Sequence, residues 1–112
     1  MVEDEALLLL CVACELREVG FRVLEACNAD QAIRALEADH EIDVLFTDVD
    51  MPGSMDGLRL SALVAERWPP IKIIVTSGKP LVRAGILPAK ATFIPKPYEL
   101  TTLQANLHTI NT

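Results

Sequence analysis

The chain has 112 residues, of which 51% are hydrophobic and 23% are charged, and its net charge is −6. This balance is typical of one globular domain with a single core, and the length excludes a second domain of ordinary size. Because the charge is acidic and no Lys/Arg cluster is present, direct binding to nucleic acid is not expected. The apolar run at residues 6–14 is too short to span a membrane, which takes roughly 20 residues.

The first third of the chain alternates helical and extended patterns. Residues 6–19 predict a helix that ends at Gly20, a residue type common at helix C-termini. Residues 21–26 begin with the apolar–polar alternation of a short strand. Asn28 or Asp30 can cap a second helix that runs to about residue 38. The side chains expected to face the core from the first helix include those of Val12, Leu16 and Val19.

Two continuous apolar runs follow, at residues 44–46 and 73–75. Such runs are typical of strands buried on both faces of a parallel sheet. A helix is predicted between them, because Asp56-Gly57 begins an amphipathic stretch and Pro69-Pro70 ends it.

Residues 79–90 are crowded with proline and glycine, which predicts a short or irregular segment. A short strand at residues 93–94 and a final helix at residues 99–108 come after it. Strands therefore alternate with helices throughout, which predicts an α/β fold with a parallel sheet and right-handed crossovers. We expect one domain over residues 1–112.

Three cysteines, Cys11, Cys14 and Cys27, do not form the even set of a disulfide framework. Cys11 and Cys14 have the spacing of a redox motif but lie inside an apolar helical run without a Gly- or Pro-rich turn. Packing of small, soft side chains on a helix explains them better than redox or metal chemistry. A reducing cytoplasm fits this usage.

Polar side chains stand where the predicted strands end. Asp48 closes one apolar run, Thr76 follows the next and Lys96 the last, while Glu3 and Asp4 lie near the start of the chain. Because ligands of parallel sheets bind outside the carboxyl ends of the strands, we expect these residues to converge at one rim. Three carboxylates at close quarters need a cation, and such hard ligands suit Mg²⁺. A carboxylate there could also attack a phosphoryl group.

Each of these residues alone has an ordinary structural explanation, but together they form a pattern. The chain resembles the receiver domain of two-component response regulators along essentially its whole length. Four stretches carry the resemblance in the family's order: VEDEALL at 2–8, LFTDVDMPGSMDG at 45–57, IIVTSG at 73–78 and FIPKPY at 93–98. The resemblance implies a flavodoxin-like, doubly wound sheet of five parallel strands in the order 2-1-3-4-5, and a cytoplasmic signalling domain rather than an enzyme.

The resemblance also implies roles for individual residues. Asp48 would be the phosphoacceptor, charged by a sensor histidine kinase or a phosphotransfer protein. Glu3 and Asp4 match the acidic pair that holds Mg²⁺ with Asp48, and the backbone carbonyl of Asp50 would be a further metal ligand. Lys96 matches the lysine that pairs with a phosphoryl oxygen. The residues that match the switch pair, a hydroxyl and an aromatic ring, are Thr76 and Phe93.

The sequence departs from the family in two places. Receivers begin with a strand of about five residues before the acidic pair, whereas only Met1 and Val2 precede Glu3 here, so a truncated first strand is expected. The second departure is at residues 79–90, where the family has its fourth helix. That helix belongs to a face that often dimerises, so a homodimer is one expectation. The chain is expected to be a stand-alone receiver or a piece of a longer protein.

Two alternatives remain open from the sequence. A pseudo-receiver would share the fold and bind partners without being phosphorylated, but the acceptor, the acids and the lysine are all present. A haloacid-dehalogenase-type phosphatase also makes an aspartyl phosphate on Mg²⁺, and Asp48-x-Asp50 resembles its first motif. That family places Thr or Val where this chain has Pro52, and its final acidic motif is not matched, since only Glu99 is acidic after Lys96.

Overall fold

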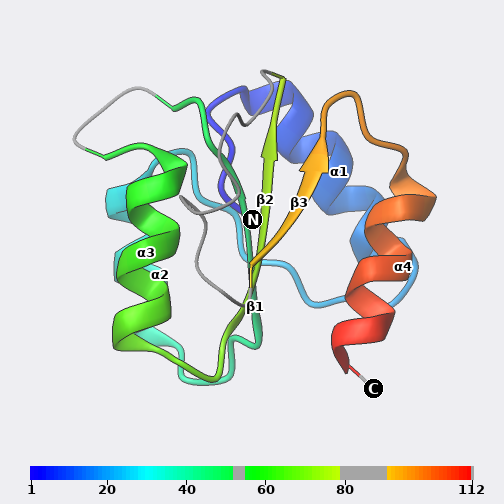
Figure 1. Ribbon diagram of the computed structural model, residues 1–112. Helices are drawn as coiled ribbons and strands as arrows, with labels where there is room; N and C mark the ends of the chain where they lie inside the picture. Colours follow the sequence, from blue (N-terminus) through cyan, green and yellow to red (C-terminus); the bar gives the residue numbers. More distant parts are fainter. Residues whose placement is uncertain (52–54, 79–90, 112) are drawn as a thin grey trace.

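The structure is a computed structural model that describes residues 1–51, 55–78 and 91–111 (Figure 1). Within these ranges the chain forms a parallel three-stranded sheet in the order β1-β2-β3, with helices packed on both faces. The strands are β1 (Val44–Asp48), β2 (Lys72–Ser77) and β3 (Ala91–Pro95), and the helices are α1 (Ala6–Glu18), α2 (Ala29–Ala38), α3 (Gly57–Arg67) and α4 (Leu100–Asn111).

Two isolated bridges extend the sheet beyond β1. Val2 pairs in parallel with Thr47 of β1 on one side and with Ala26 on the other. The spatial order is therefore Ala26, Val2, β1, β2, β3, which is the predicted order 2-1-3-4-5. The predicted α/β fold with a truncated first strand is confirmed.

The prediction of a strand at residues 21–26 was wrong for most of its length. Of these residues only Ala26 makes a bridge, and its neighbour in the sheet is Val2. A strand needs a partner along its length to satisfy its backbone groups. Beside this segment the described ladder consists of the bridge at Val2 and the bond from the N-terminal nitrogen to the carbonyl of Leu24 at 2.8 Å.

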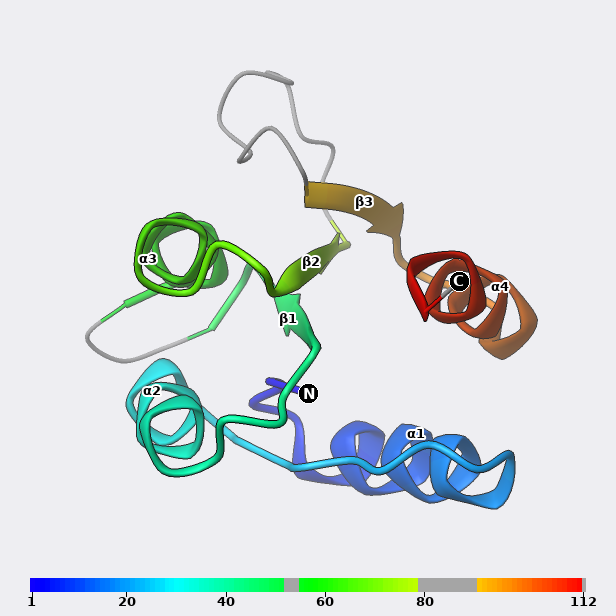
Figure 2. The same ribbon diagram turned by 90° about the horizontal axis from the view of Figure 1, so that it is seen from below.

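Side chains alternate across the sheet and build two cores. Figure 2 shows α2 and α3 on one face of the sheet and α1 and α4 on the other. Leu45, Ile73 and Val75 belong to the core beneath α2 and α3. Phe46, Ile74 and Ile94 belong to the core beneath α1 and α4. This arrangement explains why β1 and β2 read as continuous apolar runs, since each strand is covered on both faces.

Helix α1 buries a narrower stripe than expected. Leu9, Val12, Ala13 and Leu16 are buried. Val19 was predicted to face the core, but it lies one residue past the helix end and is 51% exposed. The prediction that Cys11 and Cys14 pack on a helix was also wrong, because both are exposed, as is Cys27.

The predicted helix boundaries follow from capping. The side chain of Asn28 accepts a hydrogen bond from the backbone N–H of Gln31, and that of Asp56 accepts one from Arg59, both at 2.9 Å. These side chains satisfy N–H groups that have no partner inside the helix. Helix α3 ends at Arg67, and its C-cap Trp68 lies directly before the two prolines. The irregular segment expected at residues 79–90 lies outside the described residues.

The buried N-terminal nitrogen makes stability depend on pH. Burial, partly offset by Glu25, lowers the pKa of the Met1 ammonium from 8.0 to about 6. Between these values the unfolded chain binds more protons than the folded chain, so stability rises with pH in this window. We expect the free energy of unfolding to rise by on the order of 1 kcal/mol from pH 6 to pH 8.

Urea titrations at both pH values would measure this rise, and the same chain acetylated on Met1 is the control. The acetylated chain has no titrating amine, so its free energy of unfolding should not show this rise between pH 6 and pH 8. An equal rise in both chains would show that another group is responsible.

Candidate functional site

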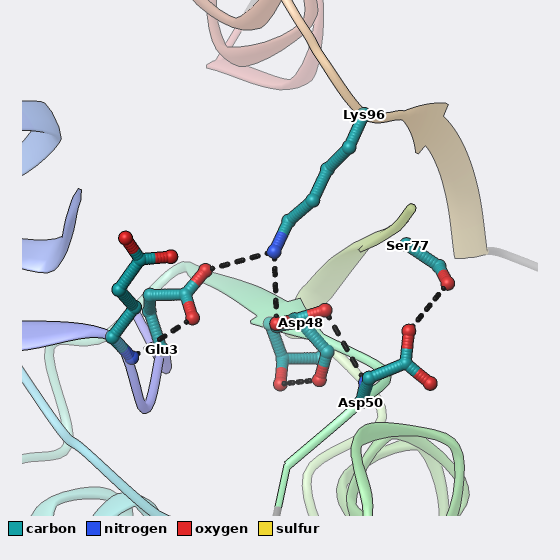
Figure 3. A network of polar contacts seen from close by, with 7 residues as sticks. Glu3, Asp48, Asp50, Ser77 and Lys96 are labelled. Carbon is teal, nitrogen blue, oxygen red and sulfur yellow. Dashed lines mark hydrogen bonds and ion pairs between the residues drawn. The ribbon is translucent and has the colours of Figure 1, made fainter. Parts of the chain in front are cut away.

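The rim of the sheet collects the predicted site residues because of strand alternation. Asp48 and Thr76 are Cα partners at the ends of β1 and β2. Each comes two residues after a side chain in the α1–α4 core, as does Lys96 after Ile94. Residues two apart in a strand share a face, so all three side chains lie at the same end of the same face. Figure 3 shows Lys96 reaching toward Asp48 and Glu3.

Lys96 joins two buried carboxylates. Its Nζ donates to Asp48 Oδ2 at 2.9 Å and to Glu3 Oε1 at 3.2 Å. The Asp48 side chain is 4% exposed and that of Glu3 is 3% exposed, whereas Lys96 keeps 23%. Two carboxylates removed from water repel each other, so the ammonium between them is required for this arrangement.

The pKa values of Glu3 and Lys96 reflect this network. Burial raises the pKa of Glu3, and the nearby charge of Asp48 adds to this rise, while hydrogen bonds from the Glu5 N–H and Lys96 oppose it. Burial by itself would lower the pKa of Lys96, but the hydrogen bonds to Asp48 and Glu3 and the negative charges of these two groups together outweigh burial, and the pKa of Lys96 is raised. Lys96 therefore stays charged at neutral pH.

Glu3, Asp4 and Asp48 form an acidic group that suits a divalent cation. One carboxylate oxygen from each lies within 4.8 Å of the others. Asp4 is exposed while the other two are buried, so the group opens to solvent on one side. Oxygen ligands that leave room for water are the kind that Mg²⁺ binds. The chemistry of these donors fits the expected ion.

Asp50 contacts the site through its N–H and its carboxylate, and the metal-ligand role expected for its carbonyl stays a prediction. Its backbone N–H donates to Asp48 Oδ1 at 3.2 Å, and its carboxylate accepts a hydrogen bond from Ser77 Oγ at 2.8 Å. Sequence reasoning missed Ser77. Its position at the end of β2, next to Thr76, was the signal that could have found it.

Thr76 and Phe93 lie in different surroundings. Thr76 is buried, and its Oγ1 has no hydrogen-bond partner among the residues that the structure describes. An unpaired buried hydroxyl is costly, so such a group at a site often awaits a ligand. Phe93 is half-buried and packs against the core that contains Val75, apart from the polar network of Asp48.

Tyr98 is a second residue that sequence reasoning did not single out. Its ring meets Phe46 edge-on with 5.5 Å between the centroids. Its hydroxyl is buried without a hydrogen-bond partner within the described ranges. Burial, followed by the negative charge of Glu3, raises the pKa of Tyr98 to about 12. The phenol therefore remains neutral beside the acidic group.

Replacement of Lys96 should reveal the repulsion between the carboxylates of Glu3 and Asp48 that its ammonium relieves. Lys96→Met leaves the carboxylates of Glu3 and Asp48 buried and unpaired, so we expect a loss of about 3 kcal/mol in the free energy of unfolding. Mg²⁺ should restore part of the loss, since it also neutralises the acids. Urea unfolding with and without Mg²⁺ measures both effects.

Lys72→Met in β2 is the matched control, because the described residues supply no ion pair to Lys72. Equal losses in the two variants, or no effect of Mg²⁺ on Lys96→Met, would contradict the role of Lys96.

The comparison with protein families agrees with this site. A sequence model of the response regulator receiver domain matches residues 1–108. The chain belongs to the family of response regulator receiver domains, the signalling domains of two-component systems.

Individual relatives support the assignment. The chain is 28% identical to a putative NtrX-like response regulator of Rickettsia bellii over 102 residues, which are 88% of this chain and 21% of that protein. It is 30% identical to the transcriptional regulatory protein PdtaR of Mycobacterium tuberculosis over 106 residues, which are 92% of this chain and 51% of that protein. The chain thus spans at most about half the length of these relatives.

A solved structure shares the fold closely. The receiver domain of the hybrid histidine kinase CckA superposes with a TM-score of 0.83 and 32% identity, over 99% of this chain and 95% of that one.

Among the described residues, no helix is both long enough and apolar enough to cross a membrane.

Proposed function

We propose that this chain is a phosphorylation switch in which Asp48 accepts a phosphoryl group from the phosphohistidine of a sensor kinase or phosphotransfer protein. The observation that carries the proposal is the carboxylate of Asp48, 4% exposed, held by Lys96 at the end of β1 and beside two further acids. The likeness to a receiver domain of a hybrid histidine kinase supports a kinase as the partner. The switch would act in the cytoplasm.

The reaction joins an Asp48 oxygen to phosphorus while the bond from phosphorus to the donor's histidine nitrogen breaks. The imidazole leaves with that electron pair. Glu3, Asp4, Asp48 and the carbonyl of Asp50 would hold Mg²⁺, which supplies positive charge where two anions approach. Lys96 would exchange its bond to Asp48 for a phosphoryl oxygen.

Thr76 would complete the switch. Its buried hydroxyl lacks a partner among the described residues, so a phosphoryl oxygen on Asp48 would offer it one. A shift of Thr76 toward that oxygen would change packing at the end of β2, and we propose that Phe93 turns inward in response. A receiver communicates with its output through a face whose packing changes in this way.

The test is incubation of the chain with acetyl phosphate, with and without Mg²⁺. Intact-mass spectrometry should show one phosphoryl group per chain, and only with the metal ion. Continuous release of phosphate from an ester substrate would instead favour a phosphatase. If neither an adduct nor turnover occurs, and a chain extended ahead of Met1 behaves alike, a pseudo-receiver is the better description.

A further inference from the structure

The hydroxyl of Tyr98 is buried close to the acidic group and has no hydrogen-bond partner. Among the described residues, only Thr76 Oγ1 shares this condition. A buried polar atom without a partner is rare in folded proteins, because it has lost its bonds to water and gained none in return. A phenylalanine would fill the same space without this cost. The hydroxyl is therefore expected to find a partner in another state of the site.

Tyr98 lies within electrostatic reach of the whole network at the rim. Its ring meets Phe46 edge-on and packs against the core face at whose end Lys96 projects. After burial, the charge of Glu3 affects the pKa of Tyr98 most, followed by the charges of Lys96 and Asp48, and this pKa is raised. Only the two carboxylates in this set accept hydrogen bonds. The larger influence of Glu3 indicates that its carboxylate is the nearer acceptor.

Each carboxylate oxygen of Glu3 has one donor in this structure. Oε2 accepts from the backbone N–H of Glu5 at 3.1 Å, and Oε1 accepts from Lys96 Nζ at 3.2 Å. The Glu3 side chain is 3% exposed, so water cannot replace a lost donor. The N–H of Glu3 is bonded to the carbonyl of Ala26, which fixes the backbone. Departure of Lys96 therefore leaves Oε1 buried without the donor that it has here.

Lys96 has both a reason and room to leave Glu3. Its ammonium is repelled by a divalent cation at the acidic group and attracted by a phosphoryl oxygen on Asp48, so either occupant of the site draws it away. A cavity of about 590 Å³ lies between α1 and the start of α4, and both Lys96 and Tyr98 line it. The lysine side chain can therefore move without displacing the core.

We propose that Tyr98 is a positioning residue of this site, whose hydroxyl donates to Glu3 Oε1 when Lys96 leaves that oxygen. The hydrogen bond holds the buried carboxylate in place, as hydrogen bonds commonly do for carboxylates that ligate metal ions. The inference rests on the proposed function, since it concerns the same site, but it needs no phosphoryl group. Mg²⁺ alone, or loss of the lysine, is enough to bring the hydroxyl into use.

The test uses Tyr98 as its own reporter, because it is the only tyrosine in the chain. A chain labelled with ¹³C at the tyrosine Cζ gives one NMR signal from this ring. Addition of Mg²⁺ should move the signal downfield, because a phenol that donates to a carboxylate gains phenolate character. Lys96→Met should move it downfield without Mg²⁺. Lys72→Met is the control and should leave the signal in place.

The double variant Lys96→Met, Glu3→Ala separates the hydrogen bond from loss of the lysine charge. It lacks the same ammonium but has no acceptor at position 3, so the downfield shift should disappear. An equal shift in the single and double variants would overturn the proposal, because the acceptor would then be another group. A signal that moves neither in Lys96→Met nor with Mg²⁺ would overturn it too. If Lys96→Met does not fold, Mg²⁺ titration of the unaltered chain decides.

Tyr98→Phe shows whether the hydrogen bond positions Glu3. The variant keeps the ring, so the Tm without Mg²⁺ should not fall, whereas Mg²⁺ binding measured by calorimetry should weaken by on the order of tenfold. Equal Mg²⁺ affinity in the two chains would overturn the positioning role.

Uptake of a phosphoryl group from acetyl phosphate distinguishes this inference from the proposed function. A chain that is phosphorylated while its Tyr98 signal stays in place under Mg²⁺ refutes only the role of Tyr98. A chain that takes up no phosphoryl group, but whose signal moves with Mg²⁺, refutes only the phosphorylation of Asp48.

Discussion

An Asp48→Asn chain is expected to take up no phosphoryl group from acetyl phosphate under conditions in which the unaltered chain takes up one. The change keeps the size and burial of the side chain but replaces the attacking carboxylate oxygen by an amide, which is no nucleophile. Intact-mass spectrometry should detect no phosphoryl adduct on this variant. The adduct on the unaltered chain should be removed by hydroxylamine, because an acyl phosphate is labile to it.

Asp50→Asn is the matched control for this experiment. Asp50 lies two residues away, its N–H donates to Asp48, and its carboxylate accepts from Ser77. The substitution keeps the backbone and a side-chain acceptor, so phosphorylation should persist. An adduct on Asp48→Asn, or loss of the adduct on Asp50→Asn alone, would assign the acceptor role to another residue.

Gly57→Ala is expected to destabilise the chain by more than about 3 kcal/mol, which is among the largest effects of a single methyl group. A Cβ on Gly57 would lie 1.9 Å from the carbonyl oxygen of Asp48 and 2.8 Å from the Cα of Val49. The N–H of Gly57 also donates to the carbonyl of Val49 at 3.0 Å. Because backbone atoms oppose the new carbon, a side-chain rotation cannot relieve the clash.

Gly78→Ala is the control, since a Cβ there meets no atom of the described residues within 4 Å. Its cost should stay within about 0.5 kcal/mol. Urea unfolding compares the two variants, and the rate of phosphorylation shows whether Asp48 has moved. A stable Gly57→Ala chain with unchanged phosphorylation would show that α3 can shift away from β1 without disturbing the site.

Local signals in the sequence determined the elements and the rim of the sheet. Continuous apolar runs identified β1 and β2, Asn28 or Asp30 marked the start of α2, and Asp56 marked that of α3. These signals depend on backbone hydrogen bonding and side-chain period, which act over a few residues. The convergence of Asp48, Thr76 and Lys96 followed from parallel topology alone, since all carboxyl ends then meet at one edge.

Only the tertiary structure decided which side chains face solvent and which polar groups pair. The sequence of helix α1 predicted that Val12 and Leu16 lie inside, but the helix is apolar almost all round, so its sequence could not show that Cys11 and Cys14 lie outside. The face that meets the sheet depends on the space left by Phe46 and α4, which are distant in sequence.

The same holds for the contacts within the site. The bond from Ser77 to Asp50 spans 27 positions, and the bond from Lys96 to Glu3 spans 93. The close approach of Gly57 to Asp48 likewise depends on the path of the loop between them. The sequence by itself determined the kinds of groups at the rim, because strand ends carry them there. Their pairing, burial and charge balance depend on how segments that are far apart in the sequence pack together, and no local sequence pattern predicts this packing.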